Sequence, residues 1–586
     1  MAIRAVMAQK SGIVVIHDAS CGRWLRFSNP LTIFEAETEN DVIPALKEVQ
    51  AAAGKGLYAA GFVSYEASPA FDSALNVKHK SGFPLLWFGV YEKAEEIVLP
   101  PATTGENDRD GEDHVRWLPS ISREQYSKAI SRIKDYIREG ETYQVNYTMR
   151  LKRAFEDNPW RFFLELVNAQ QCRYGAYIDT EKWTVCSSSP EMFFEYDKGA
   201  LVSRPMKGTV KRGLTNEDDR KKAEWLKASE KNHAENLMIV DMVRNDLGRI
   251  AVPGTVTADS LFDVEKYPTL WQMTSTISCK TDAGLTGIFS ALFPPASITG
   301  APKARTMEII AELEDSPRKL YTGTIGFITA QNRMQFNVAI RTVIIDKEDK
   351  SAEYGVGGGI VWDSEKENEY EECTLKAKVL THNLPKLRLL ESILFTPEEG
   401  YFLLQEHISR ICASAEYFCY PFSRDKALAM LDAFIQTLEK KPCKVRMLFA
   451  KDGGIEINSE PVKPAGPILV ALAAKPVDSS NVFLYHKTTN RRIYEEAKAS
   501  RPEFDDVILY NERGEITEGS SSNIVVELEA KLFTPPISCG LLGGTFRSSL
   551  IKAGNISERV INVETLKDCS HIYFINSVRK WRDAKL

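Results

Sequence analysis

The sequence GVGGGIV at residues 355–361 is followed closely by the acidic sequence EKENEYEECTLK at residues 365–376. The first is typical of a strand and the second of a helix, on which Glu369, Glu372 and Lys376 would share one face. Carboxylate oxygens on such a face can hold a hard cation, and the lysine ammonium can bind a substrate carboxylate. The glycines would let backbone amides approach the same ligand closely.

The same two stretches also have a purely structural interpretation. A charged helix is often a solvated face held by salt bridges, and a glycine run in a strand can mark a bulge. From the charges alone, the solvated face is the more common outcome. The functional interpretation therefore depends on the rest of the chain.

The bulk composition excludes several classes of protein. The 586 residues are enough for two or more domains, and 43% hydrophobic with 26% charged residues is ordinary for globular proteins. The formal net charge of -6 argues against nucleic-acid binding. No apolar run is long enough to span a membrane, and residues 1–24 make a poor signal peptide. The ten cysteines form no Cys-x-x-Cys pair, so we expect a reduced, cytoplasmic protein without disulfides or structural zinc.

Two segments suggest how the chain is divided. Residues 100–113 are polar and rich in Pro, Gly, Asp and Glu, which predicts an exposed loop. Residues 380–386 follow a charged helix, and Pro385 disfavours the continuation of that helix. We therefore place a junction there, between domains of residues 1–382 and 387–586. Strand and helix signals are mixed in both domains, including apolar residues at helical spacing over residues 122–138. This mixture predicts an α+β or α/β fold class throughout.

A series of short motifs in the first domain resembles the chorismate-utilising enzyme family over about residues 115 to 380. Each motif is weak alone, but their order is specific: YQVN at 143–146, SPE at 189–191, RPMKGT at 204–209, RND at 244–246, MTST at 273–276, TGAPK at 299–303, YTGTIG at 321–326 and AIRT at 339–342, before the glycine run and acidic helix. The resemblance implies an antiparallel β-sandwich core with outer helices and chorismate as substrate.

The lysine of RPMKGT, Lys207, indicates which reaction of this family to expect. Relatives that form aminodeoxychorismate carry the lysine, whereas anthranilate synthases usually carry alanine. By resemblance, Glu191 would be the general acid that protonates the departing C4 hydroxyl. Lys207 would attack C2 as that hydroxyl leaves, and ammonia would then attack C4 and displace the lysine from C2. Both roles need shifted pKa values, because a free lysine is protonated and a free carboxyl is ionised at neutral pH. The alternative for Lys207 is a structural or substrate-pairing lysine.

The resemblance also implies a metal site and a substrate site. Glu235, with Glu369 or Glu372, would hold Mg²⁺ against the ring carboxylate of chorismate, and such oxygen donors suit this ion. An arginine and a tyrosine would bind the enolpyruvyl carboxylate. The implied substrate-binding residues are Gly208, Thr209, Thr299, Tyr321, Arg341, Gly358 and Lys376.

The expected nucleophile is ammonia. Water-using relatives place a lysine base where this chain has Gln144, and glutamine cannot activate water in that way. The chain has no Gly-x-Cys-x-Gly turn of a glutaminase. We therefore expect a separate glutaminase subunit to supply the ammonia.

Motifs in the second domain resemble those of fold-type IV pyridoxal-phosphate enzymes: HISR at 407–410, HKTTNR at 486–491, TEGSSSN at 517–523, GLLGGTFR at 540–547 and NSVR at 576–579. The resemblance implies two small α/β subdomains, pyridoxal 5'-phosphate as cofactor, and a homodimer formed through this domain. Lys487 would be both the cofactor lysine and the catalytic base, while Glu518 would keep the pyridine nitrogen protonated. Arg410 and Thr545 would bind the phosphate, with a backbone amide at Phe546, where relatives often carry threonine.

Together the two domains predict consecutive activities, an aminodeoxychorismate synthase followed by an aminodeoxychorismate lyase. They would convert chorismate and ammonia to 4-amino-4-deoxychorismate, then release pyruvate to give 4-aminobenzoate for folate biosynthesis. An anthranilate synthase large subunit fused to a fold-type IV aminotransferase is the alternative, which Lys207 disfavours. A scaffolding subunit with decayed sites would have lost Lys207, Glu191, Lys487 or Glu518, and all four are present.

Overall fold

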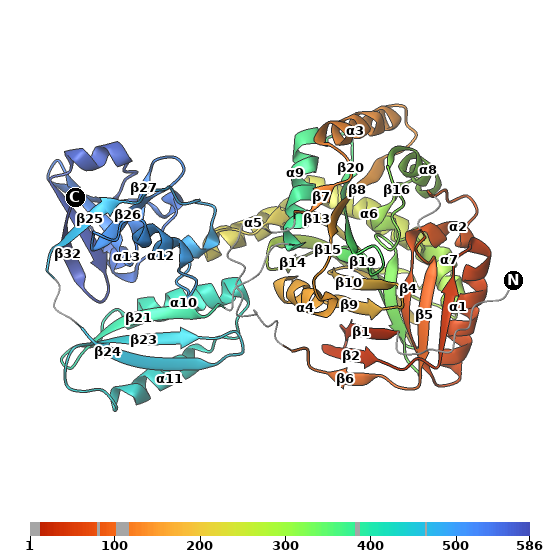
Figure 1. The fold of residues 1–586 in the computed structure, drawn as a ribbon, viewed down its shortest axis with the longest axis horizontal. Helices are drawn as coiled ribbons and strands as arrows, with labels where there is room; N and C mark the ends of the chain where they lie inside the picture. The colour runs from red at the N-terminus through yellow and green to blue at the C-terminus, as the bar shows by residue number, and fades with distance from the viewer. Residues whose placement is uncertain (1–11, 79–81, 101–115, 171, 381–386, 463–465) are drawn as a thin grey trace. The chain divides into compact units, whose positions relative to one another are not determined.

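The computed structural model describes residues 12–78, 82–100, 116–170, 172–380, 387–462 and 466–586 (Figure 1). Most of the predicted loop at residues 100–113 and of the predicted junction at 380–386 therefore lies outside the described residues. The chain divides into two compact units. One contains residues 1–211 and 223–383, and the other contains residues 212–222 and 384–586.

The first unit is built on two antiparallel sheets of ten strands each (Figure 1). In spatial order, the first sheet contains β16 (Gly300–Ala301), β8 (Gln144–Ala154), β20 (Ser351–Ile360), β19 (Thr342–Asp346), β10 (Trp183–Ser189), β9 (Tyr174–Asp179), β1 (Ile13–Asp18), β2 (Arg23–Phe27) and β6 (Glu95–Ile97), with β7 (Leu118–Pro119) paired to β8. The second contains β13 (Met206–Lys211), β15 (Leu270–Lys280), β12 (Ala200–Arg204), β11 (Met192–Asp197), β18 (Met334–Val338), β17 (Thr324–Ile328), β4 (Tyr58–Val63), β5 (Leu86–Tyr91) and β3 (Thr32–Ala36), with β14 (Thr257–Lys266) paired to β15.

The two sheets pack face to face around an aromatic core. Phe27 of β2 and Phe327 of β17 belong to different sheets, and their ring centroids lie 6.3 Å apart. Val14 and Ile16 of β1 and Phe62 of β4 are buried in the same cluster. Alternation along each strand directs these side chains inward, so the strands form a sandwich. This architecture confirms the expected antiparallel β-sandwich.

Helices cover the outer faces of the sandwich. Against the first sheet lie α3 (Arg123–Arg138), α4 (Pro159–Gln170), α8 (Lys303–Leu313) and α9 (Lys366–Ala377). Against the second lie α1 (Glu39–Gly54), α2 (Ser68–Phe71), α6 (Glu230–Gly248) and α7 (Leu285–Leu292). Both the outer helices and the mixed fold class agree with the prediction.

The helix predicted over residues 122–138 shows why such segments form. Ser122 caps α3, because its Oγ accepts a hydrogen bond from the Gln125 amide at 3.2 Å while Gln125 Oε1 accepts one from the Ser122 amide at 2.7 Å. This reciprocal pair satisfies two donors at the start of the helix. Tyr126, Ile130 and Ile133 then fall on one face, where all three are buried. The capping residues and the apolar periodicity therefore indicate the same helix.

The second unit contains two smaller α/β subdomains with separate cores. In the first, the four-stranded sheet β22 (Gly400–Tyr401), β21 (Leu389–Thr396), β23 (Cys443–Phe449) and β24 (Ile455–Pro461) packs with α10 (Leu404–Phe418) and α11 (Arg424–Ile435). The second has an eight-stranded sheet of β27 (Ile516–Gly519), β26 (Asp506–Tyr510), β25 (Ile468–Leu472), β32 (Lys580–Lys585), β31 (His571–Asn576), β28 (Asn523–Leu528), β29 (Lys531–Thr534) and β30 (Ser557–Glu558), with α12 (Arg492–Ala499) and α13 (Thr545–Lys552).

A short segment from the middle of the sequence, residues 212–222, completes the second unit. Arg212 Nη2 donates to the carbonyl oxygen of Tyr417 at 2.8 Å, and the Tyr417 hydroxyl donates to the carbonyl oxygen of Gly213 at 2.7 Å. The guanidinium also lies 4.3 Å from the centroid of the Tyr417 ring and pairs with Asp219 at 2.6 Å. The second unit is therefore discontinuous in sequence. Within the described ranges, no helix is both long and apolar enough to cross a membrane.

Candidate active sites

The glycine run lies in β20, where it makes room for three of the expected site residues. A Cβ atom at Gly359 would collide with Lys207 Nζ and lie 3.0 Å from Gln144 Nε2. A Cβ atom at Gly358 would lie 3.1 Å from Glu369 Oε2. These glycines are therefore needed because the side chains of Lys207, Gln144 and Glu369 approach the strand closely.

A break in strand register presents Lys207 to this place. β13 pairs with β15, but the register shifts between Met206 and Thr209, so Lys207 and Gly208 form a bulge. Gly208 has a φ of 96°, which favours glycine, and a Cβ atom there would lie 3.0 Å from Asn232 Oδ1. Bulges commonly redirect a side chain next to a functional site.

Charged side chains of both signs surround Lys207. Burial lowers the pKa of Lys207, and the neighbouring Lys376 ammonium acts in the same direction. Glu235, Glu372 and Glu191 oppose this shift through their negative charge. The side chain is only half-buried, so a ligand can still reach its nitrogen. A lysine with a lowered pKa is a better nucleophile, because more of it is unprotonated at neutral pH.

The acidic helix α9 combines a salt bridge at Glu372 with a second carboxylate, Glu369, that forms no salt bridge within the described residues. Lys376 Nζ lies 2.7 Å from Glu372 Oε1 and donates to the Gly357 carbonyl oxygen at 2.8 Å. The Lys376 charge is the main reason why the pKa of Glu372 is lowered. Burial raises the pKa of Glu369, and repulsion from Glu372 adds to this despite a hydrogen bond from Ser364. Both interpretations of this helix, salt bridge and ligand face, therefore describe part of it.

The carboxylates fit a magnesium ion that shares its ligands with a substrate. Repulsion between Glu369 and Glu372 is the kind of interaction that a bound cation relieves. In the part of the chain that the structure describes, however, no three acidic, histidine or cysteine side chains converge as a complete metal site. Mg²⁺ commonly takes one or two carboxylates and completes its shell with substrate oxygens and water.

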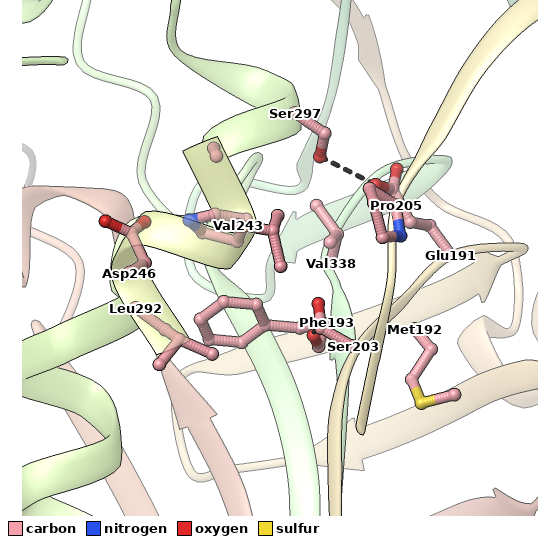
Figure 2. Close-up of a pocket in the computed structure, with 12 residues that line it drawn as sticks. Glu191, Met192, Phe193, Ser203, Pro205, Val243, Asp246, Leu292, Ser297 and Val338 are labelled. Carbon is pink, nitrogen blue, oxygen red and sulfur yellow. Dashed lines mark hydrogen bonds between the residues drawn. The ribbon is translucent and has the colours of Figure 1, made fainter. Parts of the chain in front are cut away.

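Glu191 lies between β10 and β11, beside a small cavity (Figure 2). Its side chain is 3% exposed, and burial raises its pKa to about 7. Ser297 Oγ donates to Glu191 Oε1 at 2.6 Å, and the Met206 amide donates to the same oxygen at 3.4 Å. A carboxyl group with this pKa is largely protonated at slightly acidic pH and can act as a general acid. The Ser297 contact was not anticipated from the sequence.

The other expected substrate residues come from strands and loops of both sheets. Arg341 is half-buried with a φ of 50°, and its Nη1 donates to Gln170 Oε1 at 2.8 Å. The ring of Tyr321 lies against Gly355, where a Cβ atom would collide with it. Thr299 is fully buried, whereas Thr209 is exposed, and only the first is held as part of the core.

Gln144 has an unusual environment for an amide. It is fully buried, and within the described residues neither Oε1 nor Nε2 of its side chain has a hydrogen-bond partner. Buried polar groups are almost always paired, so an unpaired one next to Lys207 points to a missing ligand. This is the position where, by resemblance, water-using relatives carry a lysine base.

In the second unit, Lys487 lies in the loop before α12. Its side chain is half-buried, and its pKa is lowered to about 8, first by burial and then by the positive charge of Arg410. The carboxylates of Glu391 and Glu518 oppose this shift. The structure therefore places Lys487, Arg410 and Glu518 close enough to influence one another, although they are far apart in sequence.

Glu518 is held firmly at the end of β27. Oε1 accepts hydrogen bonds from the Tyr494 hydroxyl at 2.8 Å and the Leu542 amide at 3.1 Å, and Oε2 accepts one from Asn523 Nδ2 at 3.2 Å. Burial raises its pKa to about 7. A protonated pyridine nitrogen would restore the ionised form, because opposite charges stabilise each other. Tyr494, on α12, was not anticipated from the sequence.

Arg410 is oriented by a buried carboxylate that the sequence analysis missed. Arg410 Nε and Nη2 donate to the two oxygens of Glu391 at 2.9 and 2.6 Å. His407 Nδ1 lies 2.6 Å from Glu391 Oε2, and its Nε2 lies 3.3 Å from Thr545 Oγ1. Burial alone would raise the pKa of Glu391, but Arg410 and His407 hold it at about 2.

The first turn of α13 begins at Thr545 and offers backbone amides for an anion. The Phe546 ring packs against Phe402 and Trp581, with centroids 5.9 and 6.3 Å away, so only its amide remains for a ligand. Arg410 Nη1 donates to the Gly543 carbonyl oxygen at 3.3 Å and so lies beside this turn. Three features together fit pyridoxal phosphate: Lys487 with its lowered pKa, the hydrogen-bonded carboxyl group of Glu518, and the first turn of α13.

About half of this chain is similar in sequence to two curated proteins. The chain is 39% identical over 320 residues to "Aminodeoxychorismate synthase, chloroplastic" of Arabidopsis thaliana, covering 54% of this chain and 34% of that protein. It is 38% identical over 272 residues to "Aminodeoxychorismate synthase component 1" of Escherichia coli (strain K12), covering 46% and 60%. The chain thus spans less than two thirds of the length of these relatives.

A solved structure shows the fold of the first unit. Anthranilate synthase component I from Streptococcus pneumoniae superposes with a TM-score of 0.51 at 23% identity, covering 65% of this chain and 92% of that one. Residues 388–586 match the model of amino-transferase class IV. Residues 14–382, more than half of the chain, match the model of chorismate binding enzymes, and the protein belongs to that family.

Proposed function

We propose that the first unit converts chorismate and ammonia to 4-amino-4-deoxychorismate and water, and that the second eliminates pyruvate to give 4-aminobenzoate. The observation that carries the proposal is the pairing of Lys207, whose pKa is lowered, with Glu191, whose pKa is raised to about 7. The aminodeoxychorismate synthases among the relatives support the choice of product. 4-Aminobenzoate is the precursor from which folate is made.

In the first reaction, Lys207 attacks C2 of chorismate while Glu191 gives its proton to the C4 hydroxyl. A bond forms between Nζ and C2, the ring double bonds shift, and the C4 oxygen leaves as water. Ammonia then forms a bond to C4, the double bonds shift back, and the amine of Lys207 leaves C2 with its electron pair. Glu191, now a carboxylate, takes a proton from the attacking ammonia, so the acid is regenerated.

The remaining groups of the first unit position the substrate. Glu369 and Glu372, with Glu235, would hold Mg²⁺, which neutralises the ring carboxylate when it is bound. Arg341, with Tyr321, receives the enolpyruvyl carboxylate, for which a planar guanidinium is suited. Gly208, Thr209, Thr299, Gly358 and Lys376 complete the proposed substrate contacts.

In the second reaction, Lys487 removes the proton at C4 of 4-amino-4-deoxychorismate. The bond between C3 and the ether oxygen then breaks, the enolpyruvyl group leaves as pyruvate, and the ring becomes aromatic. Pyridoxal phosphate, which the class IV match implies, supplies an electron sink when it is bound. Glu518 would keep its pyridine nitrogen protonated, and Arg410, Thr545 and the Phe546 amide would hold its phosphate.

Two partners belong to the proposal. A separate glutaminase subunit supplies ammonia, since the chain has no glutaminase motif of its own. A second copy of this chain pairs through the second unit to form a homodimer. Size-exclusion chromatography with light scattering tests the homodimer. Glutamine-dependent turnover with an added glutaminase tests the glutaminase partner.

The first experiment combines purified protein, chorismate, Mg²⁺, ammonium and pyridoxal phosphate, with products identified by liquid chromatography and mass spectrometry. We expect 4-aminobenzoate and pyruvate in equal amounts. Lys207→Ala should stop chorismate consumption, whereas Lys487→Ala should accumulate 4-amino-4-deoxychorismate. Lys211→Ala, which alters an exposed lysine of the same strand as Lys207, is the matched control. Anthranilate as the product would refute the assignment of the first reaction.

A further inference from the structure

Ser297 is the closest polar neighbour of the proposed acid. It lies in the short 3₁₀ helix η2 (Ala296–Ile298), and its side chain is 8% exposed. Its hydroxyl points at Glu191 beside the cavity that both residues line (Figure 2), with 2.6 Å between Oγ and Oε1. The Met206 amide donates to the same oxygen from 3.4 Å. Within the described ranges, the hydrogen bonds to this carboxyl group all fall on Oε1 and none on Oε2.

The backbone that carries Ser297 is fixed on both sides by buried groups. Arg318 Nη1 donates to the Ile298 carbonyl oxygen at 3.1 Å, and the Asn146 amide donates to the Thr299 carbonyl oxygen at 2.8 Å. Arg318 is itself held by Glu314, with 2.6 Å between Nη2 and Oε1 at about 1% and 3% exposure. A hydroxyl on such a support keeps its direction during a reaction, which is what a positioning group needs.

The arrangement leaves the two oxygens of Glu191 with different roles. A protonated carboxyl group has one O–H donor and one carbonyl oxygen that only accepts. Two donors already point at Oε1, so the proton is favoured on Oε2. After the proton has been transferred, the same serine bond stabilises the carboxylate, and a hydrogen bond to an ionised acceptor is stronger than one to a neutral acceptor.

We infer that Ser297 is a positioning residue for the acid step: it occupies Oε1 of Glu191, directs the transferable proton to Oε2, and stabilises the carboxylate that remains. The inference rests on the proposed role of Glu191. It gives Ser297 no contact with substrate and no proton of its own to transfer to chorismate. Its effect should therefore be on kcat and on pH dependence more than on substrate affinity.

The test compares Ser297→Ala with two related variants. Ser297→Thr keeps the hydroxyl. Ser203→Ala is the matched control, because Ser203 is 4% exposed and lines the same cavity, but donates to the Phe193 carbonyl oxygen at 2.7 Å instead. We expect Ser297→Ala to lower kcat for aminodeoxychorismate formation by about 10- to 100-fold, a fraction of the roughly 10²- to 10⁴-fold that general acid catalysis contributes, because Glu191 itself remains. KM should change by less than about 3-fold, since the chorismate contacts remain.

The pH profile separates positioning from mere structural support. The Ser297 hydrogen bond lowers the pKa of Glu191, opposing the effect of burial. Its removal should therefore move the basic limb of the kcat profile to higher pH by about one unit, and Ser297→Thr should restore both the limb and the rate. If Ser297→Ala matches Ser203→Ala in rate and in profile, the inference is wrong.

Infrared spectroscopy tests the same bond without turnover. Glu191→Gln identifies the carbonyl stretch of protonated Glu191 by its loss. Ser297→Ala should move that stretch to higher frequency, because a carbonyl that loses a donor becomes stiffer, while Ser203→Ala should leave it in place. A protein that makes no aminodeoxychorismate but shows the shift refutes the proposed function and supports the contact. Full activity without any shift refutes the contact alone. Should Ser297→Ala fail to fold, Ser297→Cys keeps the size and weakens the donor.

Discussion

Gly359→Ala would add a single methyl group at the point where β20 meets the head of Lys207. That methyl group would collide with Lys207 Nζ and press on the Gln144 amide at 3.0 Å. Gly359 is absent from the glycines with left-handed φ values, so alanine can adopt its backbone conformation. The neighbours that must move are the ends of two side chains rather than backbone. The substitution therefore displaces the proposed nucleophile while leaving the strand intact.

The size of the effect follows from the geometry. The ammonium nitrogen must retreat by about 1 Å to regain ordinary contact, and a misplacement of this size costs about 10²-fold in rate. Moving two flexible side-chain ends should lower the free energy of unfolding by only about 1 kcal/mol. Activity and stability are thus expected to separate clearly in this variant.

The assay measures kcat for aminodeoxychorismate formation at saturating chorismate, Mg²⁺ and ammonium, together with the midpoint of thermal unfolding. The second unit is an internal control, because Gly359→Ala should convert supplied 4-amino-4-deoxychorismate to 4-aminobenzoate at the wild-type rate. A variant that forms aminodeoxychorismate within about 3-fold of the wild-type rate would show that the nitrogen of Lys207 need not lie where the structure has it.

Three further outcomes are expected. Thr545→Ala should weaken pyridoxal phosphate binding several-fold in a fluorescence titration, whereas Phe546→Ala should lower thermal stability with less effect on binding, because its ring packs away from the turn. Burial raises the pKa of Glu518 to about 7, so the contribution of protonated Glu518 to the stability of cofactor-free protein is fully present below pH 4.5 and is lost as pH rises through 7. Glu518→Gln should therefore gain up to about 3 kcal/mol at pH 8 and nothing at pH 4.5 in scanning calorimetry, and an equal gain at both pH values would contradict this. Arg318→Ala should cost up to about 3 kcal/mol in urea unfolding, because the buried Glu314 carboxylate loses one guanidinium partner although it keeps Arg150 at 3.2 Å, while Arg305→Ala, in a partly exposed ion pair, should cost less than about 1 kcal/mol.

The family resemblance carried by the ordered motifs implied the sandwich and its outer helices, whereas periodicity predicted individual elements. The helix expected over residues 122–138 is α3, and the glycine run and acidic stretch are β20 and α9. Each of these predictions concerns one element, whose own side chains decide which face is buried. Such patterns are local, and a single sequence contains them in full.

The contacts that orient the site residues could not be predicted in this way. Ser297 meets Glu191 across 106 positions, and Tyr494 meets Glu518 across 24. Glu391, which orients Arg410, lies on a strand whose residues read simply as a buried run. Such pairs depend on how separate elements pack, and a serine or a glutamate in a strand carries no sign of its distant partner.

The discontinuous second unit has a consequence for the order in which the protein can be made and folded. Residues 212–222 leave the ribosome well before the rest of the second unit, residues 384–586, because residues 223–383 are synthesised in between. Tyr417, which receives Arg212, appears later still. The second unit cannot be completed until residues 384–586 have been made, although its segment 212–222 already exists by then. A fragment that begins at residue 387 would lack residues 212–222 altogether. Separating the two halves for study would therefore require residues 212–222 to be supplied to the second half, as a peptide or a grafted segment.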